Sequence, residues 1–409
     1  MCVIGIICIV ARHQRSAFNV KLDHTYLQLP KLFYTTTLSY PHRDPKIFLL
    51  NHSLIRELHL DRKALSAEVL SAKICPKGTL SQAYAGHQFG HFTNLGDGRA
   101  VLIGEYTCSS GHIYDIHLKG VGRTAYSRDG DRKATLNSAL REYIISEFMH
   151  RLHIPTTRGL AVVTTGENIV RDTEQPGAVM ARVALSHIRI GTFQYAKAFG
   201  SKHDLMRLAD YTIKRHNINA EENKYLHLLQ YVVKVQAELV CKWMLVGFVH
   251  GVMNTDNVTV SGQTIDYGPC TFLDIYDPNT VFSAIDTERR YRYNNQKNIT
   301  LWNLRKFANA IMELLDEDMV VARNIAKSAL DEFLPTYNKA WLTGMRGKLG
   351  LYTEEDGDLQ LAESLLDIMV KYKCDYTNTF RMLPDILSNI EGSDVREWLQ
   401  RYKDRRIEG

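Results

Sequence analysis

The patterns typical of β-strands are confined to the first half of this chain, and they constrain its fold more than any other feature. Residues 83–103 are dense in glycine and flanked by β-forming residues, so we expect a strand, a loop and a strand there. Residues 113–120, IYDIHLKG, alternate apolar and polar side chains like a half-buried strand. Residues 159–165 and 177–184 predict two more strands, separated by the acidic turn GENIVRDTEQP. The first half of the chain is therefore expected to form a sheet.

Helical periodicity interrupts these strands once and then takes over. Residues 135–154 carry apolar side chains at intervals of three and four, which predicts an amphipathic helix that stops before Pro155. Beyond about residue 200 the pattern is mostly helical, most clearly at 225–248 and 301–315. The expected class is therefore α+β.

The order of these elements, a small β-rich part followed by a larger helical part, is that of the two-lobed protein-kinase fold. We expect residues 1–184 to hold an N-terminal extension and a β-rich nucleotide-binding lobe. Residues 185–409 are expected to form a mainly helical lobe that carries the metal and catalytic loop.

Composition and charge argue against a nucleic-acid-binding protein. With 45% hydrophobic and 23% charged residues, the 409-residue chain has the composition of an ordinary soluble globular protein. The excess of 50 basic over 45 acidic residues is mild and spread along the chain, without the clustering that nucleic-acid binding requires. We therefore expect no nucleic-acid partner.

The cysteines and the N-terminus bear on the compartment. Seven scattered cysteines form no C-x-x-C pair and no metal-ligand spacing, which indicates reduced thiols in a cytosol-like compartment. The apolar run near the N-terminus precedes its basic residues and is too short to span a bilayer, so we expect neither a signal peptide nor a membrane partner. A misassigned start or a frayed extension is our interpretation, and a degenerate organelle-targeting segment is the alternative.

The segment HGVMNTDN, followed nine residues later by DYG, matches the catalytic-loop and D-F-G motifs of eukaryotic protein kinases at most fixed positions. His250, Asn257 and Asp266 all match, but Val252 stands where a kinase has its catalytic aspartate. Asp256 is the nearest carboxylate that could accept a proton. The segment is therefore a chance match, part of an inactive kinase, or part of an enzyme that uses the same residues on a different bond.

Other residues complete a kinase-like constellation in the expected order. Lys119 ends a predicted strand, and Glu142 follows 23 residues later inside the predicted helix, as in the lysine–glutamate pair of kinases. Asn257 and Asp266 supply the hard oxygen ligands that Mg²⁺ prefers. This arrangement predicts a site for a nucleotide and its metal ion.

Two arginines and two histidines are further candidates for the site. Arg182 and Arg189, seven residues apart at the junction of the two parts, could clamp phosphates, although either could equally be structural. His87 and His91 have no third partner at a metal-ligand spacing, so we expect them to be structural.

Six segments together resemble the selenoprotein O (SelO) family, the protein adenylyltransferases of bacteria and mitochondria. The resemblance runs from about residues 26–34 to about residues 301–311, with matching spacings, and is weaker beyond. The segments are GHQFGHFTNLGDGRA, HLKGVGRTAYSRDGDR, LREY, IPTTRGLAVV, SHIRIGTF and HGVMNTDNVTVSGQTIDYGP.

The resemblance implies a pseudokinase fold that binds ATP in a flipped orientation and transfers AMP to a Ser, Thr or Tyr hydroxyl of a protein. Asp256 matches the proton acceptor, and Asn257 and Asp266 match the Mg²⁺ ligands, with Mn²⁺ as an alternative metal. The positions that match nucleotide contacts are Gly96, Gly98, Arg99, Lys119, Asp131, Arg132, Glu142, Arg182, Arg189 and Asp266. It also implies self-AMPylation, and a bacterial cytoplasmic location, or a mitochondrial one in a eukaryote.

The chain departs from the family pattern at three places. Arg132 replaces a glycine expected at the nucleotide, and an arginine adopts a left-handed backbone only with strain. Residues 284–291 read AIDTERRY where the family has HSDxxGRY, so a histidine and a glycine are lost. The chain also stops at Gly409 without the redox-active selenocysteine or cysteine that ends some members, so we expect either a fragment or a chain without that feature.

We therefore expect a Mg²⁺-dependent protein adenylyltransferase. Two alternatives stay open at this point. One is conventional phosphotransfer in the manner of a protein kinase, and the other is a nucleotide-binding pseudoenzyme without transfer activity.

Overall fold

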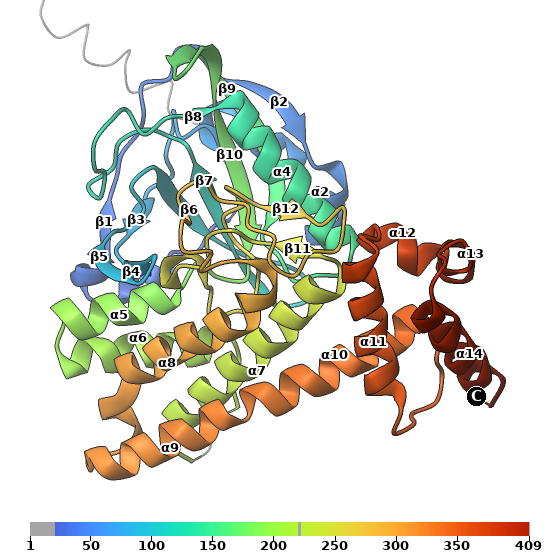
Figure 1. The fold of residues 1–409 in the computed structure, drawn as a ribbon. Coiled ribbons are helices and arrows are strands. Elements are labelled where there is room, and N and C mark those ends of the chain that lie inside the picture. The colour runs from blue at the N-terminus through green and yellow to red at the C-terminus, as the bar shows by residue number, and fades with distance from the viewer. Residues whose placement is uncertain (1–20, 220–221, 409) are drawn as a thin grey trace, which may run out of the picture. The chain divides into compact units, whose positions relative to one another are not determined.

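The computed structural model describes residues 21–219 and 222–408 (Figure 1). The apolar run near the N-terminus lies outside the described residues. The chain divides into two compact units. The first comprises the described residues up to Ala85, Asn94–Ile188 and Ala198–His216, and the second comprises Gly86–Thr93, Arg189–Lys197 and the described residues from Asn217 onward.

An antiparallel sheet of eight strands is the centre of the first unit (Figure 1). The strands follow the order β1, β3, β6, β7, β10, β9, β2, and the short β8 pairs with β10. Their bounds are β1 Tyr34–Thr36, β2 Lys46–Leu50, β3 Leu80–Gln82, β6 Ala100–Thr107, β7 Ile113–Lys119, β8 Ala134–Thr135, β9 Arg158–Val170 and β10 Glu174–Ala184. The remaining strands before residue 100, β4 Ala85–Gln88 and β5 His91–Asn94, pair with each other.

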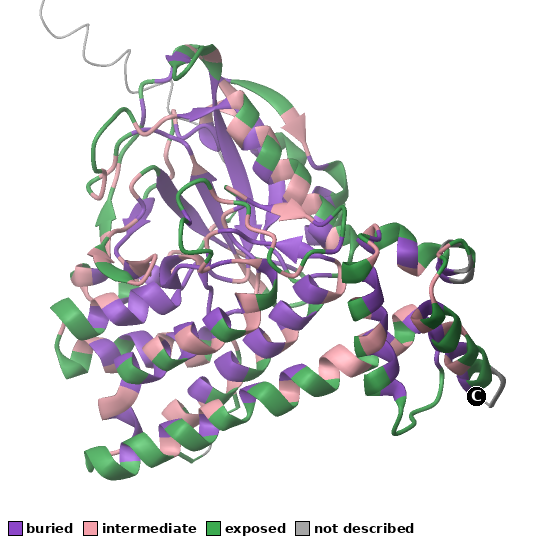
Figure 2. Cartoon of the chain, in the orientation of Figure 1, coloured by how far each residue is buried: buried purple, intermediate pink, exposed green. Residues whose placement is uncertain are grey.

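The two-residue period of a strand gives this sheet two different faces. Val179 and Ala181 of β10 belong to the main core of the unit, which packs against the short helices α2 (His52–Leu58) and α3 (Ala67–Leu70). Ala178 and Met180 belong to a smaller cluster with helix α4 (Leu136–Arg151), so α4 covers the opposite face. Figure 2 shows the central strands as buried ribbons, as expected for a sheet covered on both sides.

Helices make up most of the second unit. The long helix α7 contacts α8, α9 and α10, and α11 contacts α10 and α14. The bounds are α5 Ile190–Phe199, α7 Lys224–Leu245, α8 Gln296–Leu315, α9 Met319–Asp331, α10 Phe333–Leu349, α11 Asp358–Lys371, α12 Tyr376–Arg381, α13 Leu383–Ser388 and α14 Ser393–Glu408. A small sheet of β11 (Phe248–Val249) and β12 (Thr271–Phe272) flanks the HGVMNTDN segment, which contains the one-turn helix η4 (Thr255–Asn257). Of the described helices, none is both long enough and apolar enough to cross a membrane.

The predicted α+β class is confirmed, with an antiparallel sheet in the N-terminal half and helices in the C-terminal half. The strands predicted at 113–120, 159–165 and 177–184 correspond to β7, β9 and β10, and the predicted helices to α4, α7 and α8. Residues 83–103 contain β4, β5 and the start of β6, one strand more than predicted. The acidic turn is shorter than predicted. β9 and β10 stay paired as far as Val170 and Glu174, because Ile169 and its neighbours continue the β pattern and bury an apolar side chain.

A buried network of charged and polar groups lies at one end of the sheet. Asp115 of β7 accepts hydrogen bonds from the backbone and the Nδ1 of His187 at 2.8 and 3.0 Å, and it pairs with Arg215 of α6 (Lys202–Arg215) at 2.6 Å. The ring of His187 stacks on that of His117, with 4.2 Å between centroids. The pKa of His187 is lowered to about 3, chiefly by burial, and the neighbouring His117 and Arg182 contribute to the fall while Asp115 opposes it.

The low pKa of His187 predicts a dependence of stability on pH. The pKa of His187 is 6.5 in the unfolded state and about 3 in the folded state, so between these pH values only the unfolded state binds the proton. The free energy of unfolding should therefore fall as the pH drops from about 6.5 to about 3. We expect His187→Gln, which cannot take up a proton, to make this fall shallower by up to about 1.4 kcal/mol per pH unit. Denaturant unfolding of both proteins between these pH values measures it, and equal slopes would contradict the assignment.

Candidate functional site

The polar face of the sheet positions the first group of candidate residues. Ile116 and Leu118 of β7 belong to the main core. Because side chains alternate along a strand, His117 and Lys119 lie on the opposite face of the sheet. Arg182 of β10 stands opposite His117 in the antiparallel register, and Met180 stands opposite Lys119. The alternation of the strands therefore brings a histidine, a lysine and an arginine onto the face that α4 covers.

Lys119 and Glu142 form the expected pair. The Nζ of Lys119 donates to the Oε1 of Glu142 at 2.5 Å, and the two side chains are 12% and 11% exposed. Glu142 comes from the second turn of α4, whose N-terminus is capped by the side chain of Thr135. Both residues also border a small hollow together with Arg99 and Ser138.

Arg182 is held by a residue that the sequence did not single out. Its Nε donates to the Nδ1 of His117 at 3.3 Å, and its Nη1 lies 4.0 Å from the Oε2 of Glu142. Since Nδ1 accepts this bond, the Nε2 of His117 carries the hydrogen and donates it to Asp97 at 3.1 Å. A chain of contacts therefore runs from Asp97 through His117, Arg182 and Glu142 to Lys119.

The glycine-rich loop before β6 has a local structural reason for its glycines. Gly96 has a φ of +126°, and a Cβ there would lie 2.5 Å from the ring of Tyr126. The hydroxyl of Ser127 donates to the carbonyl of Gly98 at 2.5 Å, which fastens the loop to the segment beyond β7. Arg99 is exposed at the end of this loop. These contacts account for the glycines by packing, and their contact with a nucleotide stays a prediction.

Asp131 and Arg132 stand apart from the Lys119 group in their contacts. The carboxylate of the exposed Asp131 is engaged by Arg171, with 2.6 Å between Oδ1 and Nη2, and this bond lowers its pKa. Arg132 has a φ of +59°, which is the left-handed conformation expected for the glycine that it replaces. The second family glycine that is lost, at Arg289, also has a positive φ, of +52°. The left-handed backbone expected for Arg132 is thus present, and it is found at both positions where an arginine replaces a family glycine.

The second unit gathers the other group of candidate residues. The Nη2 of Arg189 lies 3.6 Å from the Oδ2 of Asp266, which is 19% exposed and has a φ of +64°. The amide nitrogen of Asn257 donates to the carbonyl of Val252 at 3.0 Å, which leaves its oxygen as the free end of the side chain. His250 is buried and bonds the carbonyl of Ile265, so it holds the residue before Asp266 rather than joining the chemistry.

Asp256 has the most unusual environment of this group. Its side chain is almost completely buried, and its Oδ1 accepts no hydrogen bond from any described residue. The Nε2 of Gln88 is 3.5 Å from its Oδ2, which is a long contact for a hydrogen bond. Burial raises the pKa of Asp256 to about 6, and Asp266 adds to the rise while Arg189 opposes it. The result is a carboxylate with an unused oxygen and an affinity for a proton near neutral pH.

Several residues that the sequence did not indicate hold the loop around Asp256. A Cβ at Gly86 would lie 2.3 Å from the Oδ1 of Asp256, so only glycine allows this approach. Thr255 donates to Gln194 at 2.6 Å, and Gln194 in turn bonds the ring of His87 at 2.9 Å. This contact gives His87 a structural role, as expected.

Asn254 is fixed in the same way. Its side-chain oxygen accepts hydrogen bonds from the backbone of Phe89 at 3.1 Å and from the hydroxyl of Tyr291 at 2.6 Å. The hairpin β4–β5 thus supports the HGVMNTDN loop through partners that are distant in the sequence.

No protein-only metal site is formed in the described part of the chain, where no three His, Cys, Asp or Glu side chains gather closely enough to hold an ion. Asn257 and Asp266 offer one amide and one carboxylate. A metal ion held by these two would need further oxygens from a bound ligand.

Comparison with known proteins identifies relatives over nearly the whole chain. Residues 16–407 match the profile of a family described as "Protein adenylyltransferase SelO". The chain is 53% identical over 395 residues to the "Protein nucleotidyltransferase YdiU" of Anoxybacillus flavithermus, which covers 95% of this chain and 82% of the relative. It is 55% identical over 380 residues to the protein of the same name from Bacillus cytotoxicus, which covers 91% of this chain and 77% of the relative.

The two left-handed arginines predict a gain in stability. Replacing Arg132 or Arg289 with glycine removes a backbone strain of roughly 1–2 kcal/mol but adds the greater chain entropy of glycine, so we expect each change to stabilise its unit by about 0.5–1 kcal/mol. Denaturant unfolding measures the gain. The matched controls Arg132→Ala and Arg289→Ala keep the Cβ and should give no gain, and alanine variants as stable as the glycine variants would contradict the explanation.

Proposed function

The chain belongs to the SelO family of protein adenylyltransferases and is a protein nucleotidyltransferase, and we propose that it transfers AMP from ATP to a Ser, Thr or Tyr hydroxyl of a protein. The hydroxyl oxygen attacks the α-phosphorus of ATP. The bond from that phosphorus to the bridging oxygen breaks, and pyrophosphate leaves with the electron pair. The hydroxyl proton passes to Asp256.

One observation carries this proposal beyond family membership. The position of the kinase base is Val252, which has no acid–base group, whereas Asp256 is buried with a pKa of about 6 and an Oδ1 that no described residue engages. A carboxylate with this pKa is largely ionised at neutral pH yet takes up a proton readily. Asp256 is therefore suited to accept a proton where the kinase base is missing.

We propose a two-lobed kinase-like arrangement for this chemistry, with a nucleotide-binding lobe at residues 1–184 and a catalytic lobe at residues 185–409. The Lys119–Glu142 pair on a strand and a helix of the sheet unit supports the first assignment. The HGVMNTDN and DYG segments in the helical unit support the second.

Cationic side chains are the proposed contacts of the phosphates. Lys119, oriented by Glu142, and the arginines Arg182 and Arg189 would bind phosphate oxygens, and the flipped orientation of the family would direct the γ-phosphate inward and the α-phosphate toward the hydroxyl. Such contacts stabilise the charge that develops when pyrophosphate leaves.

The loop residues are proposed to contact the nucleotide more weakly. Gly96, Gly98 and Arg99 lie in the loop between β5 and β6, and Arg99 is exposed there, where it can meet a ligand. Asp131 and Arg132 have the least support, because Asp131 is engaged by Arg171.

We propose that Asn257 and Asp266 bind Mg²⁺, with Mn²⁺ as the alternative. Their oxygens fit an ion that takes one or two protein ligands and completes its shell with phosphate oxygens. When bound, the ion would neutralise negative charge on the phosphates. Arg189, 3.6 Å from Asp266, would hold that carboxylate in place.

The proposed partners are proteins with accessible hydroxyls, including the chain itself. The relatives named above are bacterial proteins, which supports a cytoplasmic location of the bacterial type.

Two substitutions test the assignment of the site. We expect Lys119→Ala and Asp266→Ala each to lower AMP transfer by about 100-fold or more, because each removes charge from the phosphates or their metal ion. Intact-mass spectrometry after incubation with ATP and Mg²⁺ should show the wild type gaining the mass of AMP. Lys46→Ala and Asp394→Ala, which break exposed ion pairs, are matched controls and should stay active. Folded Lys119 and Asp266 variants with wild-type activity would overturn the assignment.

Replacing Asp256 should separate activity from stability. Its pKa is about 6 in the folded state and 3.8 in the reference state, so its ionised form destabilises the fold increasingly as the pH rises from about 4 to 6, and fully above that. We therefore expect Asp256→Asn to lose AMP transfer and yet to raise the free energy of unfolding at pH 8 without metal by about 1–3 kcal/mol. The gain should vanish below pH 4. An active variant, or one less stable at pH 8, would refute this role.

A further inference from the structure

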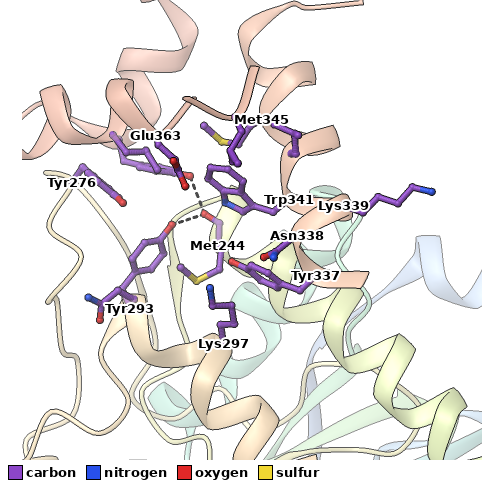
Figure 3. A pocket seen from close by; sticks show the side chains of 15 residues that line it. Met244, Tyr276, Tyr293, Lys297, Tyr337, Asn338, Lys339, Trp341, Met345 and Glu363 are labelled. Atoms are coloured by element: carbon purple, nitrogen blue, oxygen red, sulfur yellow. Dashed lines mark hydrogen bonds between the residues drawn. The ribbon is translucent and has the colours of Figure 1, made fainter. Parts of the chain in front are cut away.

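The second unit contains a large pocket that belongs to neither group of candidate residues (Figure 3). Its volume is about 480 Å³, which is within the range of small-molecule sites. It lies among α10, α11 and the segment that leads into α8, and none of Arg189, Asp256, Asn257 and Asp266 lines it. The lining side chains are Met244, Tyr276, Tyr293, Asn294, Lys297, Tyr337, Asn338, Lys339, Trp341, Leu342, Met345, Leu359, Glu363, Leu366 and Tyr376.

Aromatic rings form much of the wall and are held in fixed positions. Tyr293 and Tyr376 both donate their hydroxyl hydrogens to the carbonyl of Met244, at 2.5 and 2.8 Å. The rings of Tyr276 and Tyr376 lie 5.5 Å apart between centroids. Trp341 of α10 adds a further flat surface (Figure 3). Such a wall suits a flat apolar body, because aromatic rings pack favourably against one another.

Two tyrosine hydroxyls in this pocket have no partner of their own. Tyr276 and Tyr337 are only 8% and 6% exposed, yet neither hydroxyl forms a hydrogen bond with a described residue. Burial raises the pKa of Tyr276 to about 12 and that of Tyr337 further, so both stay protonated and can donate. Neither oxygen is among the fully enclosed side-chain atoms of the described residues that lack a partner, so both reach the open space of the pocket, where a ligand can accept their hydrogen bonds.

Lys297 adds a positive charge beside one of these hydroxyls. Its Nζ lies 5.2 Å from the centre of the Tyr337 ring, and no carboxylate of the described residues forms an ion pair with it. Figure 3 shows its ammonium group and the Tyr337 hydroxyl directed toward the same part of the pocket, whereas Lys339 points away. Together they offer two donors to a single anionic group.

Glu363 limits the charge that the pocket accepts. It is exposed on α11 and directed toward the pocket in Figure 3, so the inward-facing charges are one ammonium and one carboxylate. A ligand with several negative charges, such as ATP, would meet repulsion from Glu363.

We propose that this pocket binds a small carboxylic acid with a flat aromatic body and a single negative charge. The aromatic body stacks against the tyrosines and Trp341, and the carboxylate accepts hydrogen bonds from Lys297 and Tyr337. The site is separate from the residues proposed for AMP transfer.

The test uses 2-naphthoate and its neutral analogue 2-naphthamide as probes of the full chain by isothermal titration. We expect 2-naphthoate to bind at least about tenfold more tightly, because only its charged group forms a charge-assisted hydrogen bond with Lys297. Lys297→Met should remove this preference and Tyr337→Phe should weaken it. Lys306→Met is the matched control, since Lys306 belongs to the same helix but lies over Trp302 outside the pocket.

A second variant keeps the proposal falsifiable if Lys297→Met is unstable. Leu359 lies at the start of α11 and is exposed on the pocket wall, so Leu359→Trp should fill the opening and abolish binding without changing any charge. Equal affinities for the two probes, binding unchanged by Leu359→Trp, no binding of 2-naphthoate, or its displacement by ATP would each overturn the proposal.

Discussion

The burial of guanidinium groups is the constraint on which both groups of candidate residues depend. Arg182 and Arg189 are among the largest fully buried side chains, and an arginine cannot lose its charge to escape the cost of burial. Each must therefore be met by fixed partners within its own unit. His117 and Glu142 meet Arg182 in the sheet unit, and Asp266 approaches Arg189 in the helical unit. These partners fix the positions of both guanidinium groups, which are the proposed contacts of the phosphate oxygens.

The loop around Val252 keeps the structural contacts of a kinase catalytic loop although the catalytic aspartate of kinases is absent. His250 and Asn257 keep their structural contacts around Val252, and the absence of a side chain at Gly86 leaves room for the carboxylate of Asp256. The ionised carboxylate of Asp256 destabilises the fold above pH 6, so its burial does not serve stability, and the proposed role as a proton acceptor would explain it. Displacement at a phosphorus atom relies more on cations than on a strong base, so the proposed position of the base at Asp256, four residues after Val252, is compatible with this chemistry.

Most of what the sequence predicted rests on local periodicity. The alternation around Lys119 and the three- and four-residue spacing around Glu142 were enough to expect the pair, because a strand and a helix each fix which side chains share a face. The partners of Arg182 and Asp256 were not predicted, since His117, Gln88 and Gly86 come near them only through tertiary pairing across 65, 168 and 170 residues of chain. Only His117 could have been suspected, because it is a polar residue two positions before Lys119 and therefore on the same face of the strand. The left-handed backbone at Arg132 could be expected from the family glycine, and the lining of the aromatic pocket could not, because it joins helices that are far apart in the sequence.

The most direct test of the proposed function is to determine which phosphorus atom of ATP becomes covalently attached to protein. The folded chain would be incubated with Mg²⁺ and ATP labelled either at the α-phosphate or at the γ-phosphate, and the label retained on protein after denaturing electrophoresis would be measured. Transfer of AMP predicts retention of the α-label alone, with the γ-label released in pyrophosphate. Retention of the γ-label alone would mean that the chain transfers phosphate as kinases do, and it would contradict the central claim.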